Sequence, residues 1–126
     1  MAKTINSSAV DAAYDYIRAR VTMLTVCSVQ PTTYTQANAT YMLAKVAITS
    51  TGLTVAAGDA GGSSRKCTTT AKSGVSVSTT GAAKFIAWAG STGSTLLLVT
   101  TCTSQTITTG NTVTIPAHKH EFGDLT

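Results

Sequence analysis

Two histidines near the end of the chain are the residues best suited to binding a metal ion. His118 and His120 are one residue apart and are followed by Glu121. In an extended segment alternate side chains point to the same side, so the two imidazoles could share a metal ion with a third ligand from elsewhere. The alternative is a polar tail, residues 116–126, that packs on a neighbouring subunit. We favour the tail, and the sequence predicts no metal site.

Three cysteines offer a second kind of chemistry. Cys27, Cys67 and Cys102 are odd in number and widely spaced, and no two of them form a Cys-x-x-Cys pair. A zinc site needs four well-placed ligands, and a disulfide framework normally needs an even number of cysteines. All three lie in runs rich in Thr and Val, where a free thiol packs as a small hydrophobic group. We expect buried free thiols and folding in a reducing cytoplasm, with one disulfide as the alternative.

Five carboxylates are available for acid–base chemistry, and no two of them form an evident pair. Asp11 and Asp15 lie in a predicted helix, where capping and the helix dipole explain them. Asp59 lies in a glycine-rich turn, and Glu121 and Asp124 lie in the tail. The sequence contains neither a Gly-x-Ser-x-Gly nucleophile motif nor a Walker phosphate-binding loop. It therefore predicts a protein that is not an enzyme and that binds no cofactor.

The composition indicates one small, mainly β domain spanning residues 1–126. The chain has 26 Thr, 12 Ser and 10 Gly, and charged residues make up only 11% of it, against about a quarter in an average soluble domain. Thr- and Val-rich segments separated by Gly are typical of short strands joined by turns. The apolar run at 96–99 is far shorter than the ~20 residues of a membrane-spanning helix, and residues 1–6 do not resemble a secretory signal.

The charges are few and scattered. Nine Lys and Arg against five Asp and Glu give a net charge of +4, and Arg65–Lys66 is the only adjacent basic pair. A nucleic-acid surface would combine clustered cations with nearby aromatic side chains. We therefore expect neither nucleic acid nor a membrane as a partner.

Apolar spacing predicts one helix near the N-terminus. A stripe at i, i+3, i+4 and i+7, typical of one helix face, consists of Val10, Ala13, Tyr14 and Ile17. Ser8 is suited to cap this helix, because its hydroxyl oxygen can accept hydrogen bonds from free backbone N–H groups. The arm and the helix together occupy residues 1–20.

The rest of the chain predicts strands. The expected strands are 21–29, 41–49, 51–57, 66–71, 75–79, 82–89, 95–101, 106–108 and 112–115. Segment 41–49 also permits a helix, although its β-branched residues favour a strand. Residues 58–64 indicate a flexible loop, and residues 109–111 indicate a tight hairpin between the last two strands. Many short strands with regular turns predict a small antiparallel β-sandwich, jelly-roll-like, with one N-terminal α-helix.

The aromatic residues divide between the core and a candidate interface. In the segment AKFIAWA, alternation puts Ile86 and Trp88 on one face and Phe85 with Ala87 on the other. Core packing is the favoured role of Trp88, with an interface anchor as the alternative. The candidate interface residues are Tyr16, Arg18, Trp88, His118, His120 and Phe122.

The layout of the chain resembles small virion proteins of tailed bacteriophages. An Ala-rich helix (SSAVDAAYDYIRA) precedes the segments LTVCSVQPTTYTQAN and YMLAKVAI, a glycine-rich centre, GAAKFIAWAGSTGSTLLLVTT and GNTVTIPAHKHEF. The resemblance implies a non-enzymatic capsid decoration or cement protein that binds the outer surface of the major capsid protein lattice and bridges capsomers. It also implies a dimer or trimer, made in the host cytoplasm and located on the capsid surface, whose N-terminal arm and C-terminal tail reach partners.

Two other roles remain open at this point. A tail, neck or fibre component fits the same resemblance. A carbohydrate- or surface-binding β-sandwich module is a different class of function, and it should expose aromatic side chains beside polar loop residues. The only candidates are Tyr34, in a loop, and Tyr41, at the first position of segment 41–49, which weakens that interpretation.

Overall fold

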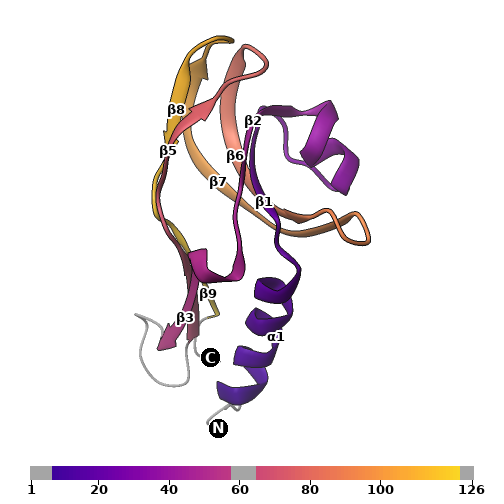
Figure 1. Cartoon of the computed structure of the whole chain (residues 1–126), viewed down its shortest axis with the longest axis vertical. Helices are drawn as coiled ribbons and strands as arrows, with labels where there is room; N and C mark the ends of the chain where they lie inside the picture. Colours follow the sequence, from indigo (N-terminus) through magenta and orange to yellow (C-terminus); the bar gives the residue numbers. More distant parts are fainter. Residues whose placement is uncertain (1–6, 58–64, 123–126) are drawn as a thin grey trace, which may run out of the picture.

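The computed structural model describes residues 7–57 and 65–122 (Figure 1). The predicted loop 58–64 and the arm residues 1–6 lie outside the described residues. The described elements are α1 Ser7–Arg20, β1 Met23–Cys27, the π-helical turn Gln36–Thr40, β2 Met42–Ala47, the 3-10 turn Ser50–Gly52, β3 Leu53–Ala57, β4 Arg65–Thr69, β5 Lys72–Ser76, β6 Gly81–Gly90, β7 Thr95–Ile107, β8 Thr112–Ile115 and β9 Lys119–Phe122.

The strands form three antiparallel sheets. Their orders are β2-β1-β6-β7, β3-β4-β9 and β5-β8. Strands make up 53% of the structure, so the fold is mainly β and sandwich-like, with one helix near the N-terminus. This confirms the fold class predicted from the composition and the spacing of turns. Segment 41–49 contains the strand β2, as favoured, and not a helix.

The β5–β8 pair is attached to the outer edge of β2. The backbone N–H groups of Ser78 and Thr79 both donate to the carbonyl of Leu43, at 2.8 and 3.2 Å, and Ala44 forms an isolated bridge with Val77. Within the described residues, the strands therefore follow one another round the molecule as β7-β6-β1-β2-β5-β8. In this order β7 and β8 are the two end strands, and no backbone pairing joins them. We call the open junction between β7 and β8 the seam.

The seam corrects the expected hairpin between the last two predicted strands. The turn itself is present, because Asn111 N–H donates to the Thr108 carbonyl at 3.1 Å and Gly110 has a φ of 91°. However, β7 pairs with β6 while β8 pairs with β5. The two consecutive strands splay apart after the turn, because each has found a partner earlier in the sequence.

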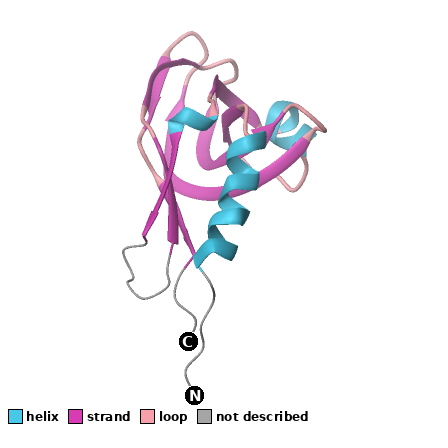
Figure 2. Cartoon of the chain, turned by 60° about the horizontal axis from the view of Figure 1, so that its bottom comes forward, coloured by secondary structure: helices cyan, strands magenta, loops and turns pink. Residues whose placement is uncertain are grey.

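Helix α1 lies against β3 and β4 (Figure 2), and most of the expected stripe packs in the core. Val10 and Tyr14 are buried at 3% and 1% exposure, and Ile17 packs partly against the core. Ala13 is exposed, so the stripe is narrower than predicted. Ser8 lies inside the helix and is not its N-cap, because the described helix already includes Ser7.

Asp11 has a long-range role that the sequence did not reveal. Its two carboxylate oxygens accept hydrogen bonds from Nε and from one terminal nitrogen of Arg65, at 2.7 and 3.0 Å. Both side chains are largely covered, with 32% and 23% of their surfaces exposed. Such a two-point ion pair is stronger and more directional than a single contact. It ties α1 to β4, whereas we expected Asp11 to support its own helix.

The core lies under β1 and β6, the two central strands of the four-stranded sheet. Leu24, Thr25, Val26 and Cys27 are all buried, because β1 has a strand on each side and is covered on both faces. Trp88 of β6 is the largest side chain with no exposed surface. These buried residues of β1 and β6 lie beneath the seam and beneath the C-terminal segment.

The described part of the predicted tail, residues 116–122, belongs to the fold, and residues 123–126 lie outside the described residues. Residues 119–122 form β9, which pairs with β4 so that Cys67 lies opposite His120. Thr69 N–H also donates to the His118 carbonyl at 2.7 Å, just before β9 begins. The tail prediction was wrong because the partner strand of these residues lies about fifty positions earlier in the chain, where no local pattern points to it.

Candidate functional site

The two histidines that were weighed as metal ligands contact protein groups. Nε2 of His118 accepts a hydrogen bond from the indole N–H of Trp88 at 2.9 Å, and Nδ1 lies 3.0 Å from the carbonyl oxygen of Pro116. A carbonyl can only accept, so the proton of the neutral ring sits on Nδ1 and the lone pair of Nε2 faces the indole. Thr69 Oγ1 lies 3.1 Å from the same Nδ1. His118 therefore anchors the C-terminal segment.

His120 forms the second anchor. The hydroxyl of the buried Tyr14 lies 3.1 Å from Nδ1 of His120, 3.1 Å from the His120 carbonyl oxygen and 3.3 Å from the Arg65 carbonyl oxygen. The rings of Tyr14 and His120 meet edge to face, with centroids 6.0 Å apart. The Tyr14 side chain thus joins α1, β4 and β9. Among the residues that the structure describes, no group of three His, Cys, Asp or Glu side chains is placed to hold a metal ion.

The other candidate interface residues lie in different environments. Tyr16 is 51% exposed on α1, and the guanidinium of Arg20 stacks over its ring at 3.7 Å. Arg18 forms an ion pair with Asp15 at 3.4 Å, and its Nε is buried without an acceptor among the described residues. Trp88 has no exposed surface and is a core residue, the role we favoured, so it does not contribute to the surface. The side chain of Phe122 lies outside the described residues.

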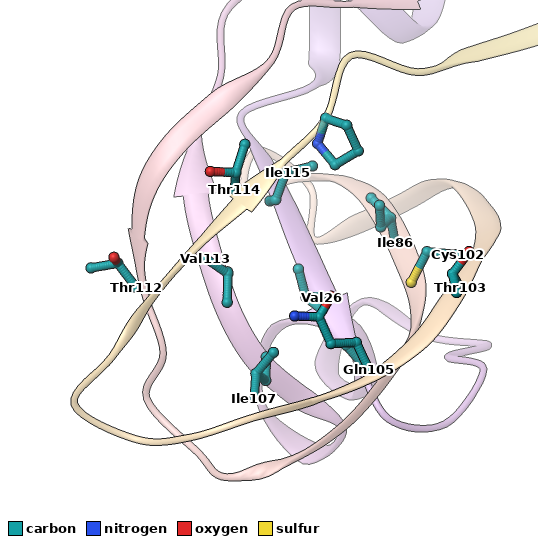
Figure 3. Close-up of a pocket in the computed structure, with 12 residues that line it drawn as sticks. Val26, Ile86, Cys102, Thr103, Gln105, Ile107, Thr112, Val113, Thr114 and Ile115 are labelled. Carbon is teal, nitrogen blue, oxygen red and sulfur yellow. The ribbon is translucent and has the colours of Figure 1, made fainter.

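A cleft opens at the seam between β7 and β8 (Figure 3). It has a volume of about 390 Å³. Its floor includes three side chains that are each 5% exposed, Val26, Ile86 and Ile107. One wall comes from β7 and the other from β8, whose Val113 and Ile115 side chains point into the cleft while Thr112 and Thr114 point away from it (Figure 3). The cleft thus has an apolar floor and an apolar β8 wall, and among the described residues Lys, Arg, Asp and Glu are absent from its lining.

A β-bulge shapes the β7 wall of this cleft. Ala83 pairs with Gln105 and Phe85 pairs with Thr101, so the three residues 102–104 stand opposite Lys84 alone. Bulges bend a strand and aim side chains away from the regular ladder. A second cavity of about 520 Å³ continues past the bulge along residues 100–103. Both cavities share Cys102 in their lining.

The cysteines are free, and they differ in access. Cys27 and Cys67 have no exposed surface, as expected for buried thiols, whereas Cys102 is half-buried in the cleft wall. Burial raises the pKa of the Cys67 thiol to about 11, a shift partly opposed by the positive charge of Arg18. Burial also raises the pKa values of Cys27 and Cys102. The thiols therefore stay protonated near neutral pH, and Cys102 is the one that reagents can reach.

The cleft was missed by the sequence analysis because β7 and β8 were expected to pair as a hairpin. A usable signal does exist in the sequence. None of the 34 residues between Lys84 and Lys119 is Asp, Glu, Lys or Arg, and this stretch contains the whole of β7 and β8. The absence of these charged residues over such a length distinguishes this part of the chain from the rest.

Comparisons with protein-family models, with curated proteins and with solved structures found no match to this chain. No helix among the described residues is long and apolar enough to cross a membrane.

Proposed function

We propose that this chain is a non-enzymatic structural protein of a tailed-phage virion, acting as a capsid decoration protein. In this role it binds the outer surface of the major capsid protein lattice, bridges capsomers and associates with copies of itself as a dimer or trimer. The observation that carries the proposal is the uncharged edge strand β7. The layout resemblance described above supports the same assignment.

The exposure of β7 is unusual for an edge strand. Its thirteen residues include no charge and no proline, and Leu96, Leu97, Leu98 and Val99 are all half-buried. Proteins that remain alone in water usually protect such edges with lysines, prolines or a covering loop. The opposite edge of the same sheet has that protection, because β2 carries the exposed Lys45 and is covered by residues 77–79.

An uncharged edge suits a protein that is covered in its working state. Burying threonine hydroxyls and half-exposed aliphatic side chains carries little of the desolvation cost of burying charges. When the same weak contact repeats over a shell, the contacts add up to a strong attachment. A low overall charge, which lowers solubility for a free monomer, is then tolerable.

The first experiment measures the mass of the purified protein by light scattering, alone and after mixing with capsid shells of its phage. We expect a dimer or trimer that co-sediments with the shells at about one copy per capsid subunit. A Val99→Lys variant places a charge on β7 and should reduce binding. The matched variant Thr54→Lys places the same charge on the exposed face of β3 and should bind like the wild type.

The copy number separates this role from its alternatives. Failure to bind shells would contradict capsid decoration. Binding at only a few copies per particle would contradict it as well, and would favour a tail, neck or fibre component. Retention on immobilised glycans, without shell binding, would favour the carbohydrate-binding module.

A further inference from the structure

The groups around His118 fit only one protonation state of its ring. Nε2 accepts a hydrogen bond from the indole N–H of Trp88 at 2.9 Å, and the proton on Nδ1 faces the carbonyl oxygen of Pro116 at 3.0 Å. An indole N–H can only donate and a carbonyl can only accept, so both contacts require the neutral ring. A second proton, placed on Nε2, would set two N–H donors against each other and remove the bond to the indole.

The ring can receive a proton, whereas the indole cannot find another acceptor in water. His118 is half-buried and lines the cavity of about 520 Å³, which gives solvent a route to the ring. Trp88 has no exposed surface. A buried donor that loses its partner costs the full free energy of its desolvation. Protonation of His118 is therefore accessible, and it is unfavourable as long as the ring stays against the indole.

The surroundings of the ring offer no compensation for a positive charge. From β4 the ring faces the Thr69 hydroxyl at 3.1 Å, and from β6 it faces the Trp88 indole. From β7 the thiol of Cys102 lines the same cavity, and burial raises the pKa of this thiol, so it stays neutral. Among the described residues, neither the hydrogen-bond partners of the ring nor the lining of this cavity include a carboxylate. A charged ring would lose hydration there without gaining a counter-ion.

His120, in the same segment, has a contact that tolerates a proton. Its Nδ1 lies 3.1 Å from the hydroxyl of Tyr14, and a hydroxyl can both donate and accept. The same hydroxyl lies 3.1 Å from the carbonyl oxygen of His120 and 3.3 Å from that of Arg65. A protonated His120 could therefore donate to the Tyr14 oxygen while the hydroxyl donates to a carbonyl. Cys67, opposite His120 in β4, is kept uncharged by its raised pKa.

The Trp88–His118 bond fastens a segment that ends in a strand. The carbonyl of His118 accepts a hydrogen bond from the Thr69 N–H at 2.7 Å, and the next residues form β9, which pairs with β4. The indole bond is the link from this segment to β6, in the other sheet. Among the described strands, β9 alone covers one edge of β4. Detachment of β9 would therefore leave β4 with an unpaired edge.

We propose that His118 is a pH-sensitive latch, which holds residues 116–122 on the fold when its ring is neutral and lets β9 detach from β4 when its ring is protonated. The detached segment binds a proton that the attached segment excludes. Attachment is therefore complete above the range in which histidines titrate, about pH 6.5, and weakens as the pH falls through that range. The latch depends on contacts within this chain and does not rest on the proposed function.

Hydrogen–deuterium exchange followed by mass spectrometry measures how often the segment opens. The exchange rates at pH 7.5 and pH 5.0 are each divided by the rate of an unfolded peptide of the same sequence, which removes the chemical effect of pH. We expect residues 116–122 to open about tenfold more often at pH 5.0. Strand β1, buried at the centre of its sheet, is the internal reference, and its opening should change less than about twofold.

Two matched variants separate the latch from the other histidine of the segment. His118→Gln keeps a side-chain oxygen that can accept from the indole and that does not titrate. His120→Gln makes the same substitution two residues away. We expect the response to pH to disappear in His118→Gln and to persist in His120→Gln. Trp88 is the single tryptophan of the chain, so its fluorescence should change over the same pH range in the wild type and in His120→Gln only.

Each other outcome would overturn the latch. Equal opening of residues 116–122 at both pH values would do so, as would the same acceleration in His118→Gln. Acceleration that includes β1 would show acid unfolding of the whole domain instead. If His118→Gln does not fold, nuclear magnetic resonance of the wild type decides. The ring signals of His118 should then shift over the pH interval in which the segment opens, and a protonated His118 in a closed segment would refute the proposal.

Discussion

The indole N–H of Trp88 donates to Nε2 of His118 at 2.9 Å, and this bond joins the centre of the four-stranded sheet to the segment that leads into β9. Trp88 has no exposed surface, so its N–H has no access to water. The His118 ring also meets the indole edge to face, with centroids 5.7 Å apart. One side chain thus satisfies a buried donor and positions the C-terminal strand.

Removing the acceptor should therefore cost stability. We expect His118→Ala to lower the free energy of unfolding by about 1–3 kcal/mol, because the indole N–H is left buried without a partner. His118→Gln should recover part of this loss, since its side-chain oxygen can accept from the indole. Urea unfolding followed by circular dichroism measures both values. A double-mutant cycle with Trp88→Phe should give a coupling of about 1 kcal/mol, and strict additivity would contradict the bond.

The Asp11–Arg65 pair should matter more than the exposed pair on the same helix. We expect Asp11→Asn to destabilise the protein by about 1 kcal/mol, because it removes one side of a partly covered two-point ion pair. Asp15→Asn breaks the exposed contact with Arg18 at 3.4 Å and should cost about 0.3 kcal/mol or less. Thermal unfolding at low and high salt measures the difference. Equal effects of the two substitutions would show that α1 is not held to β4 through Arg65.

Gly90 allows α1 and β6 to approach each other closely. A Cβ atom at Gly90 would overlap the backbone carbonyl oxygen of Arg20, which cannot move without shifting the end of the helix. We expect Gly90→Ala to destabilise the fold by about 2 kcal/mol or more. The control Gly81→Ala is on the same strand and meets only the flexible Leu43 side chain at 3.0 Å, so its effect should be smaller. Melting temperatures compare the two, and a reversed order would refute the close approach.

The buried thiol of Cys67 should make stability depend on pH above 9. Its pKa is raised from 9.0 to about 11 by burial, so between these values the unfolded chain releases a proton that the folded chain retains. The stabilising effect of Cys67 is thus complete below pH 9 and is lost as the pH rises towards 11, by up to about 1.4 kcal/mol per pH unit. Urea unfolding of the wild type and of Cys67→Ala at pH 8, 9 and 10 tests this. The unfolding free energy of the wild type minus that of Cys67→Ala should fall as the pH rises above 9, and a difference that stays constant with pH would contradict the prediction.

Local patterns in the sequence predicted the elements whose formation depends on residues that are close together in the chain. The apolar spacing around Val10 and Tyr14 located α1, and Thr- and Val-rich runs located β1 to β4, β6 and β8. The buried positions of Cys27 and Cys67 also followed from their neighbours. Each of these features depends on side chains within a few residues of one another. The predicted strand 75–79 was misplaced, because β5 is Lys72–Ser76, and the predicted strands 95–101 and 106–108 are one continuous strand, β7.

The features that sequence analysis missed all depend on distant partners. Asp11 was assigned to its own helix, but its partner lies 54 positions away. His120 was placed in an exposed tail, but Tyr14 lies 106 positions before it. The cleft exists because β8 pairs with β5 instead of with its neighbour β7. No periodicity or turn signal reports which of several similar strands will pair.

The hydrogen bond between Trp88 and His118 cannot form until both residues have been synthesised. The two residues are 30 positions apart. At translation speeds of 5–20 residues per second, His118 is therefore added to the chain about 2–6 s after Trp88. The pairing of β1 with β6 is delayed for longer, because β6 lies about sixty residues downstream of β1. During that interval β1 exposes an apolar edge on the ribosome. The growing chain is therefore most prone to aggregate before β6 emerges, and a slow stretch of codons or a bound chaperone would have its greatest effect at that stage.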